Sequence, residues 1–341
     1  MAAYRLLLET VPLTILLTLS LIEILAEKLY GYRARRSLEV ALQNRQPVTR
    51  LPQSIACGIL LVTCLWFPLQ AQRRANPPSM KSFQIPSHGA LLNAFVYVAA
   101  GAGPHPAVIL LHGFPGNERN LDLAQEIRSA GWDVLFFNYR GSWGSPGDFS
   151  FTHGIEDTEA AVAELRSPSM AGVLRLDPTR IVLIGHSMGG FMAVEAAAAD
   201  PTIVGVGLIS AADIGGRIPR ALTKDQQEAT IRMLSASYEN DGMAPLSGCT
   251  PEGLAHEAVA NAAQWSFMSK VSLLDSRPVL VVTADDAYAR SDKGFAGALR
   301  RAGNTRVSTL HLDTDHAYSD QRGLLSGAIL RWLATIATPP Q

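Results

Sequence analysis

The chain has 341 residues, of which 48% are hydrophobic and 17% are charged, so it can form at least one large domain and does not resemble a disordered protein. Its formal net charge of −1, with no basic stripe interleaved with aromatic residues, excludes the electrostatic signature of nucleic-acid binding. Of its three cysteines only Cys249 lies in the predicted folded body, which excludes a disulfide or a cysteine-based zinc site there.

The first segment, 1–30, is strongly apolar and is a possible transmembrane helix. Its uncharged core covers only 11–22, between Glu9 and Glu23, which is short for a full span. Residues 31–54 form a basic loop, and short basic loops tend to stay in the cytoplasm. A buried core helix is the alternative, but the flanking arginines and the position outside the α/β pattern favour a membrane segment.

A second apolar run, 55–71, is a signal sequence or another transmembrane helix. Cleavage after Ala71 would release the body, although Leu69 is a poor match to the small residue expected at that point of a cleavage site. A true start near Val48 would make the run an ordinary signal sequence. Each of these interpretations places the body outside the cytoplasm, periplasmic or extracellular, and we favour an uncleaved membrane anchor followed by a linker at 72–79.

The body begins with the pattern of a β-hairpin. Two alternating runs, 81–87 and 91–99, flank His88-Gly89. A continuous apolar run at 106–111 predicts a buried strand, which leads through a glycine turn to a helix at about 120–130. The hairpin should form the antiparallel edge of a sheet.

Strands and helices then alternate along the chain. Further strands are expected at 134–138, 182–184, 203–210, 278–283 and 306–312, and further helices at 154–166, 191–199, 293–302 and 324–336. Parallel neighbours need crossover connections, so this alternation predicts a mostly parallel sheet with helices on both faces. The predicted core therefore comprises 80–211 and 271–341.

The alternation breaks over 212–270, where helices at 224–238 and 251–268 predict an inserted lid. Open α/β sheets bind ligands at the carboxyl ends of their strands, and the insertion should lie there. Six apolar residues would line a pocket or, as helical spacing favours, form the lid's own core: Met233, Leu234, Tyr238, Trp265, Phe267 and Met268.

The most informative stretch is Gly185-His186-Ser187-Met188-Gly189. It matches G-x-S-x-G, the turn that holds a nucleophilic serine between a strand and a helix, and the flanking patterns predict that strand and helix. Ser187 is the predicted nucleophile. The main-chain N–H groups of Met188 and of Phe114, in the turn after the 106–111 strand, are the predicted oxyanion donors.

A carboxylate and a histidine follow two later strands. Asp285 and Asp286 come after the 278–283 strand, and His316 comes after the 306–312 strand, in the order Ser, Asp, His. His316 is the predicted base. We favour Asp286 over Asp285 as the acid because a small and then a bulky residue follow it. His112 is expected to be structural, since a histidine at a strand end beside a glycine turn usually bonds the loop.

With these motifs, residues 80–336 resemble the α/β-hydrolase superfamily. The run Asn138-Tyr139-Arg140-Gly141-Ser142 is similar to a segment of the serine aminopeptidase and prolyl-oligopeptidase-like branches, although no propeller domain precedes it. The resemblance implies an α/β-hydrolase fold and acyl transfer on a carboxylic ester or a peptide bond, with no cofactor and no metal. A membrane-tethered binding protein that keeps the fold without using the triad is the alternative.

Overall fold

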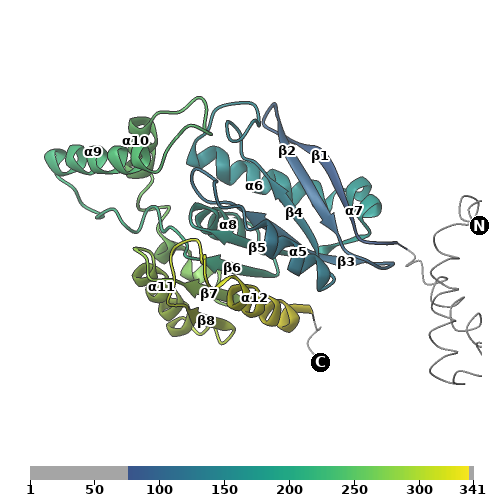
Figure 1. The fold of residues 1–341 in the computed structure, drawn as a ribbon. Coiled ribbons are helices and arrows are strands. Elements are labelled where there is room, and N and C mark those ends of the chain that lie inside the picture. Colours follow the sequence, from purple (N-terminus) through teal and green to yellow (C-terminus); the bar gives the residue numbers. More distant parts are fainter. Residues whose placement is uncertain (1–75, 338–341) are drawn as a thin grey trace, which may run out of the picture. The chain divides into compact units, whose positions relative to one another are not determined.

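The predicted hairpin forms the edge of an eight-stranded sheet in the computed structural model, which describes residues 76–337 (Figure 1). Strands β1 (Ser79–Ser87) and β2 (Ala90–Val98) pair antiparallel along their whole length. Between them, His88 and Gly89 both have positive φ angles, 44° and 86°. A two-residue turn of this kind matches the twist of the strands that it joins.

The other strands are parallel to one another and run in the order β1-β2-β4-β3-β5-β6-β7-β8. They are β3 (His105–Leu111), β4 (Asp133–Phe137), β5 (Leu176–His186), β6 (Gly205–Ile209), β7 (Val279–Thr283) and β8 (Val307–His311). Strand β2 joins them by antiparallel pairing with β4. The predicted mostly parallel sheet is therefore confirmed, and the carboxyl ends of β3 to β8 lie along one edge.

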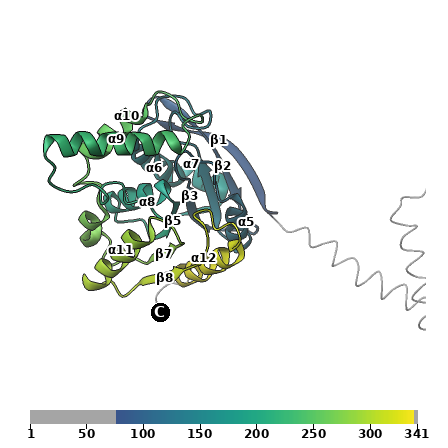
Figure 2. The same cartoon turned by 60° about the vertical axis from the view of Figure 1, so that its left-hand side comes forward.

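Helices cover both faces of this sheet (Figures 1 and 2). One face packs against α5 (Leu121–Ser129) and α12 (Arg322–Ala337), through residues such as Ile127 and Trp332. The other packs against α6 (Phe151–Arg166), α8 (Met188–Ala199) and α11 (Ala289–Arg301), through residues such as Phe191 and Phe295. A short helix that the sequence patterns do not predict, α7 (Pro168–Leu174), begins where the Ser167 side chain accepts the N–H of Met170.

The insertion between β6 and β7 contains α9 (Lys224–Asn240), α10 (Pro251–Ala260) and the 3₁₀ helix η1 (Phe267–Leu273). Figures 1 and 2 show α9 and α10 side by side, standing off the sheet. Helix α10 is anchored to the start of α6, because the Glu257 carboxylate accepts the main-chain N–H groups of Phe151 and Thr152 at 3.0 and 2.9 Å.

The helix predicted to run to residue 268 ends at Ala260, and the following residues enter the core of the body. The Trp265 ring lies 5.4 Å from that of Phe191, and the Phe267 ring lies 5.1 Å from that of Phe295. Burial of these two large side chains against α8 and α11 stabilises the end of the helix at Ala260 more than further helical turns would.

Of the other four apolar residues predicted to line a pocket or form the lid core, two are exposed and two pack against the body. Met233 and Met268 are 61% and 41% exposed, so neither belongs to a buried lid core. Leu234 and Tyr238 are partly buried against the main core.

The two predicted membrane segments and the linker before Asn76 lie outside the described residues. Within 76–337, no helix combines the length and the apolar character that a bilayer crossing requires. The interpretations of 1–71 stay predictions.

Candidate active site

The turn between β5 and α8 holds Ser187 in a strained conformation, with φ 55° and ψ −122°. A Cβ atom added to Gly185 would overlap the main chain of Gly189, and one added to Gly189 would overlap the end of β3. The Ser187 N–H also donates to the Ile209 carbonyl oxygen of β6 at 2.9 Å. Surrounding main chain thus enforces the turn and places Ser187 at the carboxyl edge of the sheet.

The turn after β3 packs directly against this serine. A Cβ atom on Gly113 would lie 2.9 Å from Ser187 Cβ, so only glycine lets this turn approach the serine so closely. Phe114 follows Gly113, and Met188 is the first residue of α8, where main-chain N–H groups have no helical partner. The two predicted oxyanion donors therefore belong to the segments on either side of Ser187.

Asp286 and His316 are in direct contact, with Asp286 Oδ2 2.8 Å from His316 Nδ1. The other oxygen, Oδ1, accepts the main-chain N–H groups of Tyr288 and Ala289 at 2.9 and 3.1 Å. Burial raises the pKa of the Asp286 carboxyl, but hydrogen bonds from His316, Ser210 and Tyr288 outweigh burial and lower that pKa to about 2. Asp286 is therefore a carboxylate at neutral pH.

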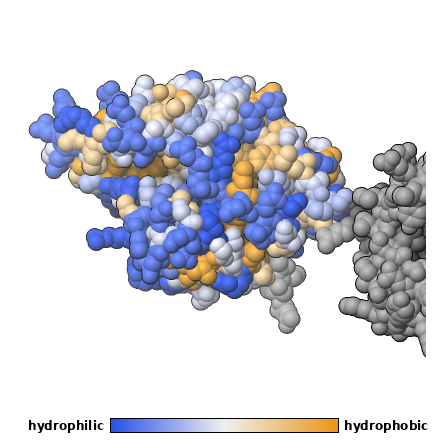
Figure 3. Space-filling view, viewed as in Figure 1, coloured by the Kyte–Doolittle hydropathy of each residue, from blue (hydrophilic) through white to orange (hydrophobic). Residues whose placement is uncertain are grey.

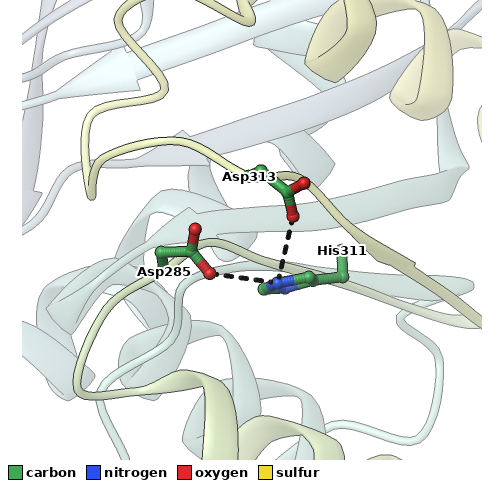
Figure 4. A group of neighbouring side chains, drawn as sticks. All are labelled: Asp285, His311 and Asp313. Carbon is green, nitrogen blue, oxygen red and sulfur yellow. Dashed lines mark ion pairs between the residues drawn. The ribbon is translucent and has the colours of Figure 1, made fainter.

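Asp285 faces a different histidine (Figure 4). Its Oδ1 lies 3.2 Å from His311 Nε2, and Asp313 approaches the same nitrogen at 3.7 Å. The possible ligand atoms of the three residues lie within 4.8 Å of one another, a spacing that a metal ion could bridge. The two aspartate side chains are 64% and 92% exposed, and a surface ion pair accounts for the arrangement.

His186 links the elbow to the loop that carries His316. Its Nε2–H donates to the main-chain oxygen of His316 at 2.8 Å, and the two imidazole rings are 4.6 Å apart. Burial, and then the charge of His316, lower the pKa of His186 to about 4, so this ring is neutral. Among the described residues no hydrogen bond joins Ser187 Oγ to His316, and such bonds often tighten only when substrate binds. The serine–histidine bond stays a prediction.

His112 bonds its own turn, in agreement with its predicted structural place. Its Nδ1–H donates to the Gly113 carbonyl oxygen at 2.8 Å. Burial lowers the pKa of His112 to about 4, so the imidazole stays neutral inside the protein.

Two fully buried hydroxyl groups, on Ser210 and Tyr318, lie behind Asp286 with Oγ and Oη 2.8 Å apart. The Tyr318 hydroxyl donates to the Val282 carbonyl oxygen at 3.1 Å, and the same oxygen accepts the Ser210 N–H at 2.9 Å. Either hydroxyl can be the donor in the contact between Ser210 and Tyr318, and a hydrogen bond from the Ser210 side chain is among the causes that lower the pKa of Asp286. Sequence reasoning missed both residues; the available signals are a serine just after β6 and a tyrosine two positions after His316.

An aromatic group joins the insertion to the site. The Tyr238 ring of α9 lies 5.5 Å from the ring of Phe114 and 5.6 Å from that of Phe151. Figure 3 shows an apolar hollow beneath the lobe that α9 and α10 form. The insertion therefore meets the turn that carries one predicted oxyanion donor.

Comparison with known families agrees with this architecture. A model of the alpha/beta hydrolase family matches residues 108–326, which is more than half of the chain. The chain belongs to the alpha/beta hydrolase family. This alpha/beta hydrolase carries Ser187, Asp286 and His316 within the matched region, and the predicted superfamily is confirmed.

Curated relatives of this alpha/beta hydrolase match only part of it. An uncharacterised protein of Mycobacterium tuberculosis is 29% identical over 171 residues, which cover 46% of this chain and 57% of the relative. An sn-1-specific diacylglycerol lipase of Xenopus tropicalis is 33% identical over 106 residues, 30% of each chain. The chain thus spans little more than half the length of the first relative and less of the second.

Solved structures share the fold over a larger part of the chain. A lipase in an open form superposes with a TM-score of 0.59 at 15% identity, covering 76% of this chain and all of its own. A thermostable carboxylesterase from a metagenomic library has a TM-score of 0.56 at 18% identity, covering 86% of this chain and all of its own. These neighbours share the fold of this chain over about three quarters of its length or more.

Proposed function

We propose that this chain is a serine hydrolase that transfers the acyl group of a carboxylic ester or an amide to water. The observation that carries the proposal is the 2.8 Å contact between Asp286 and His316 on neighbouring loops, at the sheet edge that carries the strained Ser187. A nucleophile, a base and a buried acid in this chain order form the catalytic group of many hydrolases.

The protonation states favour this chemistry. Ionised Asp286 accepts Nδ1–H of His316, which leaves the lone pair on Nε2 free to take the Ser187 proton. Ser187 Oγ then attacks the substrate carbonyl, and the N–H groups of Phe114 and Met188 stabilise the oxyanion. His316 returns the proton to the leaving group, and water repeats the sequence to release the acid.

An ester is the favoured substrate, with α9 and α10 acting as a lid over the acyl group. Support comes from the esterase and lipase neighbours, the apolar hollow of Figure 3, and the contact between Tyr238 and Phe114. Paired 4-nitrophenyl ester and 4-nitroanilide substrates with the same acyl group test the preference. Faster turnover of the anilide would refute it.

Labelling with a fluorophosphonate tests the mechanism directly. We expect one label per folded chain, located on Ser187 and absent in Ser187→Ala. That variant should also lose about 10³-fold or more of the ester turnover. Ser319→Ala, which removes an exposed serine three residues after His316, is the control and should label normally. No labelling of the folded wild type would favour a binding protein that keeps the fold without the chemistry.

We also propose that the catalytic body lies outside the cytoplasm, anchored by the N-terminal segment. Six basic residues should resist translocation between the two apolar runs: Lys28, Arg33, Arg35, Arg36, Arg45 and Arg50. Alkaline phosphatase fused after residue 80 should then be active, and a fusion near Arg45 should be inactive. The reverse pattern would overturn the proposal, and a mature start at Gln72 would indicate secretion instead of anchoring.

A further inference from the structure

A guanidinium group is stacked beside the predicted base. Arg217 Cζ lies 4.3 Å from the centre of the Tyr288 ring, and that ring lies 5.0 Å from the ring of His316. Tyr288 is itself held by its N–H, which donates to Asp286 at 2.9 Å. The Tyr288 ring thus contacts the guanidinium of Arg217 and the imidazole of His316, and it holds the cation close to the predicted base.

The hydrogen-bonding capacity of Arg217 is unused. The side chain is exposed, and within 76–337 it makes neither an ion pair nor a hydrogen bond. Stacking occupies the face of a guanidinium and leaves the N–H groups at its edge free, in the fork that binds carboxylate and phosphate oxygens.

The carboxyl groups near Arg217 do not pair with it. Asp213 accepts the N–H groups of Gly216 and Phe267 at 2.8 and 3.0 Å, and Asp292 accepts that of Ala211 at 2.8 Å. Asp241, at the end of α9, also senses the arginine charge without forming an ion pair. Burial raises the pKa of all three carboxyls, which weakens their ability to neutralise the cation at acid pH.

We propose that Arg217 binds an anionic group of the substrate, so that this chain prefers esters that carry a carboxylate or a phosphate. The proposal rests on the serine hydrolase function proposed above and narrows its substrate class. It makes Arg217 a specificity determinant that contacts substrate away from the reacting carbonyl.

Matched substrate pairs test the assignment on the full-length chain. For an anion on the acyl side, the 4-nitrophenyl monoester of adipic acid is compared with its neutral terminal amide. For an anion on the alcohol side, 4-carboxyphenyl butyrate is compared with 4-carbamoylphenyl butyrate. The background measured with Ser187→Ala is subtracted from each rate. The readout is the ratio of kcat/KM for the anionic and the neutral member.

We expect Arg217→Gln to lower this ratio about tenfold in at least one pair, with little change for the neutral ester, because a charge-assisted bidentate contact is lost. The pair that responds identifies the side of the ester that carries the anion. Added salt should lower the wild-type ratio as well. Arg220→Gln removes an exposed arginine three residues away and is the matched control.

Two results would overturn the inference while leaving the hydrolase intact. They are an unchanged ratio in both pairs after Arg217→Gln, or an equal fall after Arg220→Gln, with neutral esters hydrolysed normally in either case. A wild type that hydrolyses none of the four esters above the Ser187→Ala background would instead overturn the proposed function, and this inference with it.

Discussion

Replacing Asp286 by Asn should impair hydrolysis far more than replacing Asp285 by Asn. Asp286 has an 8% exposed side chain and meets His316 Nδ1 at 2.8 Å, whereas Asp285 is 64% exposed and faces His311. An amide at position 286 keeps the shape but removes the charge that stabilises the imidazolium, and it can select the wrong imidazole tautomer. A fall in kcat of about 10⁴-fold is expected, equivalent to about 5.5 kcal/mol of activation free energy.

The control should lose little. An exposed ion pair contributes about 0–1 kcal/mol. Even if the whole energy of the Asp285 contact were added to the activation free energy, the rate would change less than about fivefold. The assay is the steady-state hydrolysis of a short 4-nitrophenyl ester by both variants, with urea unfolding to confirm that each is folded. Equal losses, or a larger loss in Asp285→Asn, would show that the choice of acid is wrong, while the assignment of His316 would survive.

Three further outcomes follow from other contacts of the site. Tyr318→Phe removes the buried hydroxyl that contacts Ser210 behind Asp286, so we expect kcat to fall about tenfold and the acid limb of the pH–rate profile to shift; an unshifted profile would mean that the hydroxyl has only a packing role. Tyr238→Ala removes the ring beside Phe114 and should raise the rate on eight-carbon relative to two-carbon esters several-fold, whereas unchanged relative rates would show that α9 does not select the acyl group. In the folded chain His112 and His186 have pKa values of about 4, below the unfolded value near 6.5, so the unfolded chain binds more protons below pH 6.5. Each histidine should therefore lower the free energy of unfolding by about 2 kcal/mol between pH 7 and pH 5. His112→Asn should about halve that loss in urea titrations, and an undiminished loss would contradict the argument.

Much of the fold is readable from local sequence because local interactions specify it. The elbow needs a serine between Gly185 and Gly189, where no side chain fits beside the main chain, and those residues are contiguous. Central strands such as β6 and β7 are buried on both faces, so they appear as continuous apolar runs separated by helical segments. The hairpin is recognisable from alternation around His88 and Gly89, both of which adopt positive φ.

Other features depend on contacts between residues that are far apart in the chain. Local propensity favours a helix up to residue 268, but packing of Trp265 against Phe191 ends α10 early. The residues after Asp286 favour it over Asp285, but the histidine that each aspartate meets is set only when β7 and β8 pair, which brings Asp285 to His311 and Asp286 to His316.

The surroundings of the site depend on the same pairing of strands. Tyr318 reaches Ser210 only because β6, β7 and β8 are neighbours in the sheet, and this brings together residues separated by 108 positions. The stack of Arg217 on Tyr288 likewise joins the segment after β6 to the loop after β7. The sequence by itself therefore determined the chemical groups and their order along the chain, whereas tertiary packing decided which of them meet, because free energies of burial and hydrogen bonding depend on neighbours that only the folded sheet brings together.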